Sequence, residues 1–301
     1  MTRQQIEAQR RAAILATASV VLAAFCWGLN AVFAKGAFEA GIPPARLAEA
    51  RVAVALMPLV AYLAWRRRDL LIPTASARGP IILFGLGVVA VNWAYYTAID
   101  RLPVGVAISL QYTAPVLVLI MTAAVARRSP GATIWIAALL TLVGAVLVSG
   151  AYNGLHVLDG LGIVAGIGSA LSFAVYLLSA EAAGRRGAHP ATVLAAGLLV
   201  ATVAWGILLP WWSWPFDRLA ETEIVLRLLG VGLVGTLFPF LLAINAVRII
   251  SAAVAGVAAT TEPVFASGLA WLLLSQALGV PQLIGGGLVV AGVVLAQLAR
   301  R

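Results

Sequence analysis

Long apolar runs separated by short polar breaks organise the whole chain. Each run of about 18 or more residues could cross a hydrocarbon core of ~30 Å as a helix. Charged residues combined with Gly or Pro mark most of the breaks, as at 41–44 and 127–131. The pattern predicts an all-α polytopic membrane protein with ten transmembrane helices, at 14–38, 47–65, 79–98, 105–126, 132–150, 160–180, 191–212, 226–246, 253–275 and 282–299.

The two halves of the chain match at a fixed offset of 148 residues, without a gap. Thr113 matches Thr261, Pro115 matches Pro263, and the matches also include Gly131 with Gly279 and Gly144 with Gly292. Matched Pro and Gly carry weight because each dictates a backbone conformation. We therefore predict two five-helix repeats, residues 1–152 and 153–301. Because five is odd, the second repeat would cross the membrane inverted relative to the first, as in many transporters.

The basic residues predict how the helices are oriented. If the N-terminus is inside, fourteen Lys and Arg residues fall on inside segments, and six on outside segments: Lys35, Arg46, Arg51, Arg101, Arg218 and Arg227. Cytoplasmic segments of membrane proteins carry the excess of Lys and Arg. We therefore expect both termini in the cytoplasm.

Polar and aromatic side chains are concentrated in spans 1, 3 and 4 of the first half and spans 6, 8 and 9 of the second. Spans 2, 5 and 10 are nearly bare by comparison, with Tyr62, Thr141 and Gln297. Lipid cannot satisfy polar groups, so these faces should turn inward and line a central path, with spans 2, 5, 7 and 10 outside. The candidate substrate-binding residues are Trp27, Asn30, Asn92, Tyr96, Gln111, Tyr112, Ser172, Phe173, Tyr176 and Glu262.

Each type of candidate also has a structural explanation. Ser and Thr in membrane helices usually bond to a carbonyl of their own helix. A single Asn or Gln can join two helices, and Tyr or Trp near a span end can anchor the helix at the membrane interface. Spacing favours a shared face for the pairs Asn92 with Tyr96 and Ser172 with Tyr176, which are four residues apart. We predict that Trp27 and Tyr96 lie at equivalent depth, with Tyr112 at similar depth, and that the three contribute to one aromatic site.

Glu262 is the only carboxylate in a long apolar stretch, near the middle of span 9. A carboxylate at that depth costs about 2.5–3.5 kcal/mol on insertion scales. It could carry a proton, contact an ammonium group, or remain a protonated structural acid. Pro115 and Pro263 each remove a helical hydrogen bond, so we predict kinks at matched depth and a hinge at each proline.

Composition excludes other classes of protein. Apolar residues make up 62% of the chain and charged residues 10%. The net charge of +9 does not indicate nucleic-acid binding, because the basic residues cap spans and form no patch with aromatics. Cys26 is the only cysteine, so no intrachain disulfide can form. The N-terminus resembles a signal peptide, but its apolar run reaches about Phe38 and predicts an uncleaved first span.

An enzyme does not fit the sequence, and a channel is a third possibility beside the transporter. His156 and His189 lie in loops on opposite predicted sides, and no HExxH or GxSxG motif occurs. No ring of like charges or carbonyl filter indicates a channel. We expect no cofactor and no metal, and the sequence leaves the oligomeric state open.

Three stretches of the chain are similar to those of the drug/metabolite transporter superfamily, EamA type. They are Cys26–Asn30 followed by Lys35, the Leu110–Pro115 segment, and Thr261–Val264 with the Leu-rich run after it. Within that superfamily the chain looks most like the YddG-type exporters of aromatic amino acids. It departs from the family pattern at Ser275–Gln276, where a Gly-Glu pair is common, so the resemblance implies no role for that acid.

The resemblance implies a secondary transporter of the bacterial inner membrane that works by alternating access. Its substrates would be small amphipathic metabolites, including aromatic amino acids, exported from the cell. A multidrug efflux protein is the alternative within the class, because the same aromatic residues could surround a cation.

Overall fold

The computed structural model describes residues 3–102, 104–126, 131–154, 159–274 and 279–299. These residues form helices and loops, with no strand among them. Ten segments are long and apolar enough to cross a membrane, which confirms the ten predicted spans. The helices are α1 (Arg3–Glu39), α2 (Pro44–Arg66), α3 (Ala75–Arg101), α4 (Val104–Gln111), α5 (Ala114–Ala126), α6 (Ala132–Ser149), α7 (Gly160–Arg185), α8 (Pro190–Leu208), α9 (Thr222–Leu229), η5 (Gly230–Leu237), α10 (Phe238–Ala246), α11 (Ala252–Ala259), α12 (Glu262–Leu274) and α13 (Val280–Leu298).

Local chemistry explains where several helices begin and end. Pro44 and Pro190 stand at the start of α2 and α8, where a proline needs no backbone donor. Asp159 caps α7, because its side chain accepts a hydrogen bond from the Gly162 N–H at 2.7 Å. Span 7 was predicted to run to residue 212, but α8 ends at Leu208. Pro210 follows two residues later and cannot continue the helix. Four short 3₁₀ turns lie in the loops, at Arg68–Leu70, Ala151–Gly154, Trp211–Ser213 and Phe216–Ala220.

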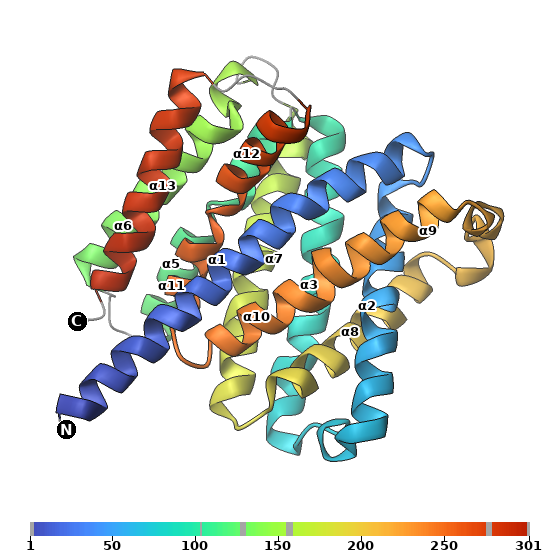
Figure 1. Cartoon of the computed structure of the whole chain (residues 1–301), viewed down its shortest axis with the longest axis horizontal. Coiled ribbons are helices and arrows are strands. Elements are labelled where there is room, and N and C mark those ends of the chain that lie inside the picture. The colour runs from blue at the N-terminus through green and yellow to red at the C-terminus, as the bar shows by residue number, and fades with distance from the viewer. Residues whose placement is uncertain (1–2, 103, 127–130, 155–158, 275–278, 300–301) are drawn as a thin grey trace.

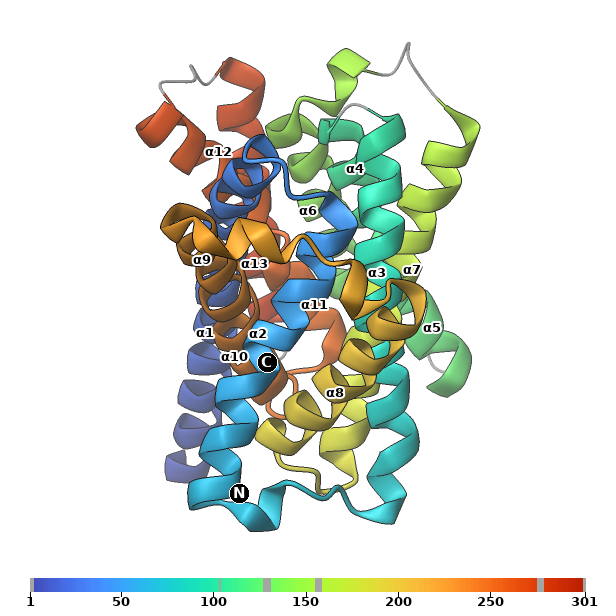
Figure 2. The same cartoon turned by 90° about the vertical axis from the view of Figure 1, so that its right-hand side faces the viewer.

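Helices from the two halves pack against each other throughout the molecule. Helix α3 runs beside α7, and α6 runs beside α13 (Figures 1 and 2). Helix α1 packs on α9, η5 and α10, the counterparts of α3 in the second half. At the crossing of α6 and α13, a Cβ on Gly144 would come within 2.7 Å of the Gly285 carbonyl oxygen. These glycines therefore allow the two backbones to approach closely.

Two of the spans are broken in the middle, at corresponding places. The fourth span is divided into α4 and α5, and the ninth into α11 and α12. Every bound of α11 and α12 lies 148 residues after the corresponding bound of α4 and α5. Pro115 and Pro263 are the second residues of α5 and α12, so the predicted kinks are confirmed as breaks just before the prolines.

The third span of each half differs. Helix α3 is continuous, whereas its counterpart is divided into α9, the π-helical segment η5 and α10. The Thr236 hydroxyl donates to the Val231 carbonyl oxygen at 2.8 Å, five residues back, which matches the π-helical repeat. A Cβ on Gly235 would overlap the Asn30 side chain of α1. The segment can lie so close to α1 because it carries glycine at this position.

Candidate functional site

The two broken spans meet through one hydrogen bond. The Tyr112 hydroxyl, beside the break after α4, donates to Glu262 Oε2 at 2.6 Å. Glu262 is the first residue of α12, and Tyr112 is only 4% exposed. The break frees both residues from continuous helix, so a side chain from each half can reach the other. This pairing of Tyr112 and Glu262 confirms neither a proton-carrying nor a structural role for the acid.

A second polar centre surrounds Arg51, which is 8% exposed and lies on α2. Its Nε donates to Thr236 Oγ1 at 2.9 Å, and its Nη1 donates to Asn92 Oδ1 at 3.1 Å. Its Nη2 donates to the Gly235 carbonyl oxygen at 2.9 Å. Asn92 is fixed in turn, since its amide nitrogen donates to the Val88 carbonyl oxygen at 2.7 Å. Arg51 thus joins α2, α3 and η5 inside the bundle.

Helix α2 is therefore not the bare outer helix that we predicted. Besides Arg51 it carries Glu49, which is fully buried and forms an ion pair with Arg46 at 2.7 Å. The sequence pattern placed Arg46 and Arg51 in an exterior segment, because basic residues near a span end usually reach out to the interface. The signal that could have found them is the presence of ionisable residues inside a span, which by default indicates a functional role.

Three of the predicted aromatic residues lie in one buried cluster. Phe173 stacks on Tyr176 at 5.4 Å between ring centroids, and Tyr176 also contacts Phe240 at 5.4 Å. Trp27 reaches the same Phe240 at 6.0 Å. Phe84 completes the cluster at 5.2 Å from Tyr176. Sequence reasoning missed Phe84 and Phe240, because an isolated Phe in an apolar span gives no signal of its own.

Tyr96 belongs to a different group of rings. It packs against Phe38 at 6.2 Å and Tyr95 at 5.9 Å between centroids. The prediction that Trp27 and Tyr96 contribute to one aromatic site is therefore wrong as far as ring contacts are concerned. Helical spacing indicates the face of a residue on its own helix, but it cannot say which neighbour that face meets.

The remaining polar candidates are spread over the bundle. The Asn30 side chain packs against Gly235, beside the Arg51 centre. Gln111 is the last residue of α4, half-buried and next to Tyr112. Ser172 donates to the carbonyl oxygen of Gly168 in its own helix at 2.7 Å, the structural role that hydroxyl groups in membrane helices commonly have.

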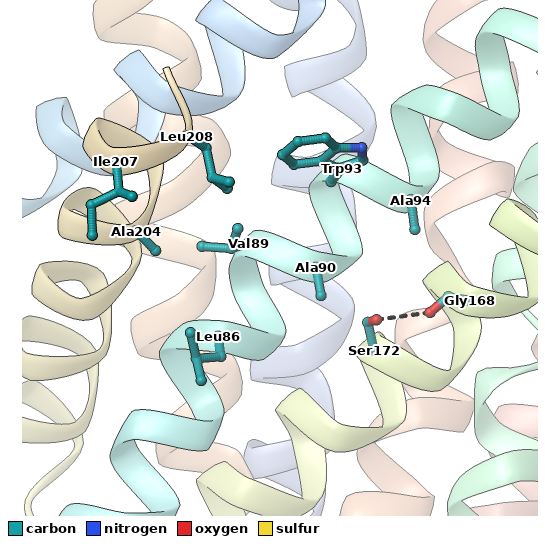
Figure 3. Close-up of a pocket in the computed structure, with 10 residues that line it drawn as sticks. All are labelled: Leu86, Val89, Ala90, Trp93, Ala94, Gly168, Ser172, Ala204, Ile207 and Leu208. Atoms are coloured by element: carbon teal, nitrogen blue, oxygen red, sulfur yellow. Dashed lines mark hydrogen bonds between the residues drawn. The ribbon is translucent and has the colours of Figure 1, made fainter. Parts of the chain in front are cut away.

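Ser172 faces a lateral pocket between α3, α7 and α8. Figure 3 shows its hydroxyl turned back to the Gly168 carbonyl, with Trp93 on the neighbouring helix α3 and the α8 residues on the far side. The pocket has a volume of about 640 Å³ and is lined almost entirely by apolar atoms. Trp93 stacks on Trp205 at 5.8 Å. Ser172 is thus separated from Phe173 and Tyr176, which turn into the aromatic cluster.

The polar groups suit binding rather than bond-making chemistry. Within the described part of the chain, no three His, Cys, Asp or Glu side chains lie together as metal ligands would. One centre contains a phenol and a carboxyl, and the other contains a guanidinium and an amide. These groups can bind a polar molecule by hydrogen bonds and charge. They lie among helices of both halves in a membrane bundle, and this arrangement defines a polytopic membrane protein with an internal polar site.

Comparison with known proteins identifies the class. The model of the EamA-like transporter family matches the chain twice, at residues 14–150 and 160–298. The chain belongs to this family, which confirms the predicted resemblance to the drug/metabolite transporter superfamily. It is a multi-pass membrane transporter whose partners are a small-molecule substrate and the lipid bilayer. The family consists of transporters, not enzymes.

Individual relatives agree with this assignment. The threonine/homoserine exporter RhtA of Escherichia coli (strain K12) is 25% identical over 251 residues, which cover 80% of this chain and 77% of RhtA. An uncharacterised transporter of Archaeoglobus fulgidus is 32% identical over 204 residues, 67% of this chain and 70% of its own. A crystal structure with a TM-score of 0.77 covers 95% of this chain and 98% of its own at 20% identity, and shows that the fold is shared.

Proposed function

We propose that this protein is a secondary transporter that exports small amphipathic metabolites, amino acids including aromatic ones. The observation that carries this proposal is the bond between Tyr112 and Glu262, which joins the broken spans of both halves at an internal polar site. Transporters commonly bind their substrates where broken helices of two repeats meet. The relatives named as exporters of threonine and homoserine support amino acids as the substrate class.

Alternating access is the mechanism that we propose. The two repeats, residues 1–152 and 153–301, would rock against each other about the site between them. The matched breaks before Pro115 and Pro263 support this, because each interrupts a span where backbone angles could change. The two halves would then open the site to either side of the membrane in turn.

The protein would lie in the bacterial inner membrane with both termini in the cytoplasm. Helix α1 begins and α13 ends toward the same side of the molecule, at the lower left in Figure 1. Because Arg51 is buried on α2, it no longer counts as an exterior charge, and the bias of basic residues toward the cytoplasmic side increases. A reporter after Arg301 should remain cytoplasmic and one at Asn153 exterior, and the reverse result would overturn the orientation.

The aromatic residues support ring-bearing substrates as part of the range. We propose that Trp27, Phe173 and Tyr176 pack against the substrate ring when the site opens, and that Tyr96 and Tyr112 lie along the same route. The polar groups of Asn30, Asn92, Gln111 and Glu262 would meet its polar ends, whereas Ser172 faces the lateral pocket. Removing the Trp27 ring should weaken the binding of aromatic substrates by about 0.5–1.5 kcal/mol beyond the effect of the lost contact area. The binding of small substrates should weaken less.

Uptake into proteoliposomes, measured with a panel of amino acids and with and without a pH gradient, tests the function. Saturable transport of threonine, homoserine or phenylalanine is the expected result. Transport of organic cations in place of amino acids would favour multidrug efflux, and flux that does not saturate would favour a channel. The buried positive charge of Arg51 favours amino acids over cations, because it would repel a cationic substrate nearby.

A further inference from the structure

Among the residues that the structure describes, Arg51 is a buried cation without a counter-ion. No carboxylate of the described residues lies within 4.0 Å of its guanidinium, although six other ion pairs occur among them. Its three acceptors are a hydroxyl, an amide oxygen and a carbonyl oxygen, all neutral. A charge removed from water and left unpaired is costly, and proteins retain such charges in membranes mainly for function.

The guanidinium also has unused donors. Arginine carries five N–H groups, one on Nε and two on each terminal nitrogen. Its hydrogen bonds to Thr236, Asn92 and Gly235 use three of them, one on each nitrogen. Within the described part of the chain, one N–H on Nη1 and one on Nη2 remain. Two such donors match the two oxygens of a carboxylate, a geometry that arginine recognises better than lysine does.

The backbone of Glu262 packs against another face of α1, at a level similar to that of the Arg51 centre. Gly28 of α1 packs against α12, where a Cβ would come within 3.4 Å of the Glu262 carbonyl oxygen. Asn30, two residues further along α1, packs against Gly235, whose carbonyl oxygen accepts from Arg51. Two residues rise about 3 Å along a helix. Helix α1 therefore has the Arg51 centre on one flank and the Glu262 centre on the other.

Among the described residues, Arg51 and Glu262 are not paired with each other. Arg51 donates to neutral acceptors on α3 and η5, and Glu262 accepts from the Tyr112 hydroxyl. Both charged side chains are therefore left without a partner of opposite charge in the described structure.

We propose that Arg51 binds the α-carboxylate of the transported amino acid while Glu262, oriented by Tyr112, binds its ammonium group. This inference rests on the proposed function as an amino-acid exporter and adds the residue that reads the carboxylate. A zwitterion matches the pair because each of its charges meets the opposite charge. An amine without a carboxylate would leave Arg51 unpaired, and an acid without an amine would leave Glu262 unpaired. The alternative is that Arg51 only joins α2, α3 and η5.

Competition assays with wild-type protein in proteoliposomes test the two ends of the substrate separately. The probes are L-threonine and L-phenylalanine, their amides, which lack the carboxylate, and their N-acetyl forms, which lack the ammonium group. We expect each amide to compete about thirtyfold or more weakly than its amino acid, since it leaves a buried charge unpaired. An amide that competes as well as its amino acid would overturn the inference.

Transport by variant proteins tests which residue binds the carboxylate of the substrate and which binds its ammonium group. Arg51→Gln should reduce amino-acid transport about thirtyfold or more and abolish the preference over the amide. Glu262→Gln should reduce the preference for the amino acid over its N-acetyl form. The preference for the amino acid over its amide should remain. Arg66→Gln, at the exposed end of the same helix, is the matched control and should behave as wild type. Equal losses for acid and amide in folded Arg51→Gln protein would mean that Arg51 only joins helices.

The design separates the two proposals. If wild-type protein transports no amino acid at all, the proposed function fails, and the inference fails with it. If wild-type protein transports amino acids without distinguishing them from their amides, only the assignment of Arg51 fails. Should Arg51→Gln not fold, the wild-type competition series decides alone.

Discussion

The two broken spans have the same backbone plan and different chemistry. At each break a threonine hydroxyl donates to the carbonyl three residues back, Thr113 to Leu110 at 2.7 Å and Thr261 to Ala258 at 2.8 Å. The side chains beside these threonines differ. Tyr112 corresponds to Thr260, whose hydroxyl bonds to its own helix at 2.5 Å. Glu262 corresponds to the buried Ala114.

This difference separates what the two halves share from what each contributes. A break in the helix is a backbone property, so the same Thr and Pro pattern produces it twice. The bond across the interface joins two different side chains, a phenol that donates and a carboxyl that accepts. The first half provides the phenol and the second half the carboxyl. We infer that the repeat supplies the movable framework, and that its divergence supplies the site.

Removing the carboxyl should have the largest effect on this comparison. Glu262→Gln keeps the shape and deletes the charge, so we expect transport to fall by about thirtyfold and its pH dependence to flatten. Transport into proteoliposomes from pH 5.5 to 8.5 measures both. Glu221→Gln, in an exposed loop, is the control. Wild-type rates and pH dependence in Glu262→Gln would identify Glu262 as a protonated structural acid.

Restoring the helices tests the shared part of the plan. Pro115→Ala and Pro263→Ala each return a backbone N–H and allow the span to straighten. We expect each change to shift the balance between access states by roughly 1–2 kcal/mol, and transport to fall about fivefold to tenfold. The folded yield, measured by size-exclusion chromatography, should fall less. Full transport by the double variant would exclude both prolines as hinges.

Removing the hydroxyl of Tyr112 tests the divergent part more gently. Tyr112→Phe deletes one hydrogen bond and leaves the carboxyl in place, so we expect transport to fall about fivefold, which corresponds to about 1 kcal/mol. Thr260→Val at the corresponding position removes only a hydrogen bond within its own helix. We therefore expect a smaller loss of transport into proteoliposomes for this variant. A double-mutant cycle with Glu262→Gln should be non-additive, because the two residues are in contact. Additive effects would contradict a functional Tyr112–Glu262 bond.

The smallest effect concerns the second helix of each half. Helix α2 follows Pro43 and has no side-chain cap, whereas His189 caps α8 by accepting from the Ala191 N–H at 3.2 Å. Burial, together with the nearby positive charges of Arg248 and Arg67, lowers the pKa of His189. The pKa of His189 in the folded protein lies below the unfolded value of about 6.5. The contribution of neutral His189 to the free energy of unfolding is therefore fully present above that pH. It declines as the pH falls below it.

We expect the decline to be about 1 kcal/mol or less, the usual size of a helix cap, since His189 is exposed. His189→Asn keeps a capping side chain and cannot titrate, so the variant should lose this part of the pH dependence. Thermal unfolding in detergent between pH 5 and 8 measures the difference. An identical slope in both proteins would show that His189 contributes nothing to it.

The sequence by itself determined the ten spans, the two breaks and the positions of most polar groups. These are local properties: an apolar run of sufficient length must form a helix in lipid, and Pro interrupts a helix wherever it occurs. Glu262 could be identified for the same reason, because a carboxylate in the middle of a span stands out against any apolar background.

Only the tertiary structure decided which of these groups meet. Helical periodicity gives the face of a residue on its own helix, but the neighbour of that face depends on helix packing between the halves. Trp27 and Tyr96 therefore separated into different ring clusters, Ser172 turned to a lateral pocket, and Tyr112 met Glu262. Arg51 shows most clearly what the sequence could not predict. Near a span end an arginine can extend to water or turn inward, and the acceptors on α3 and η5 determine that it turns inward.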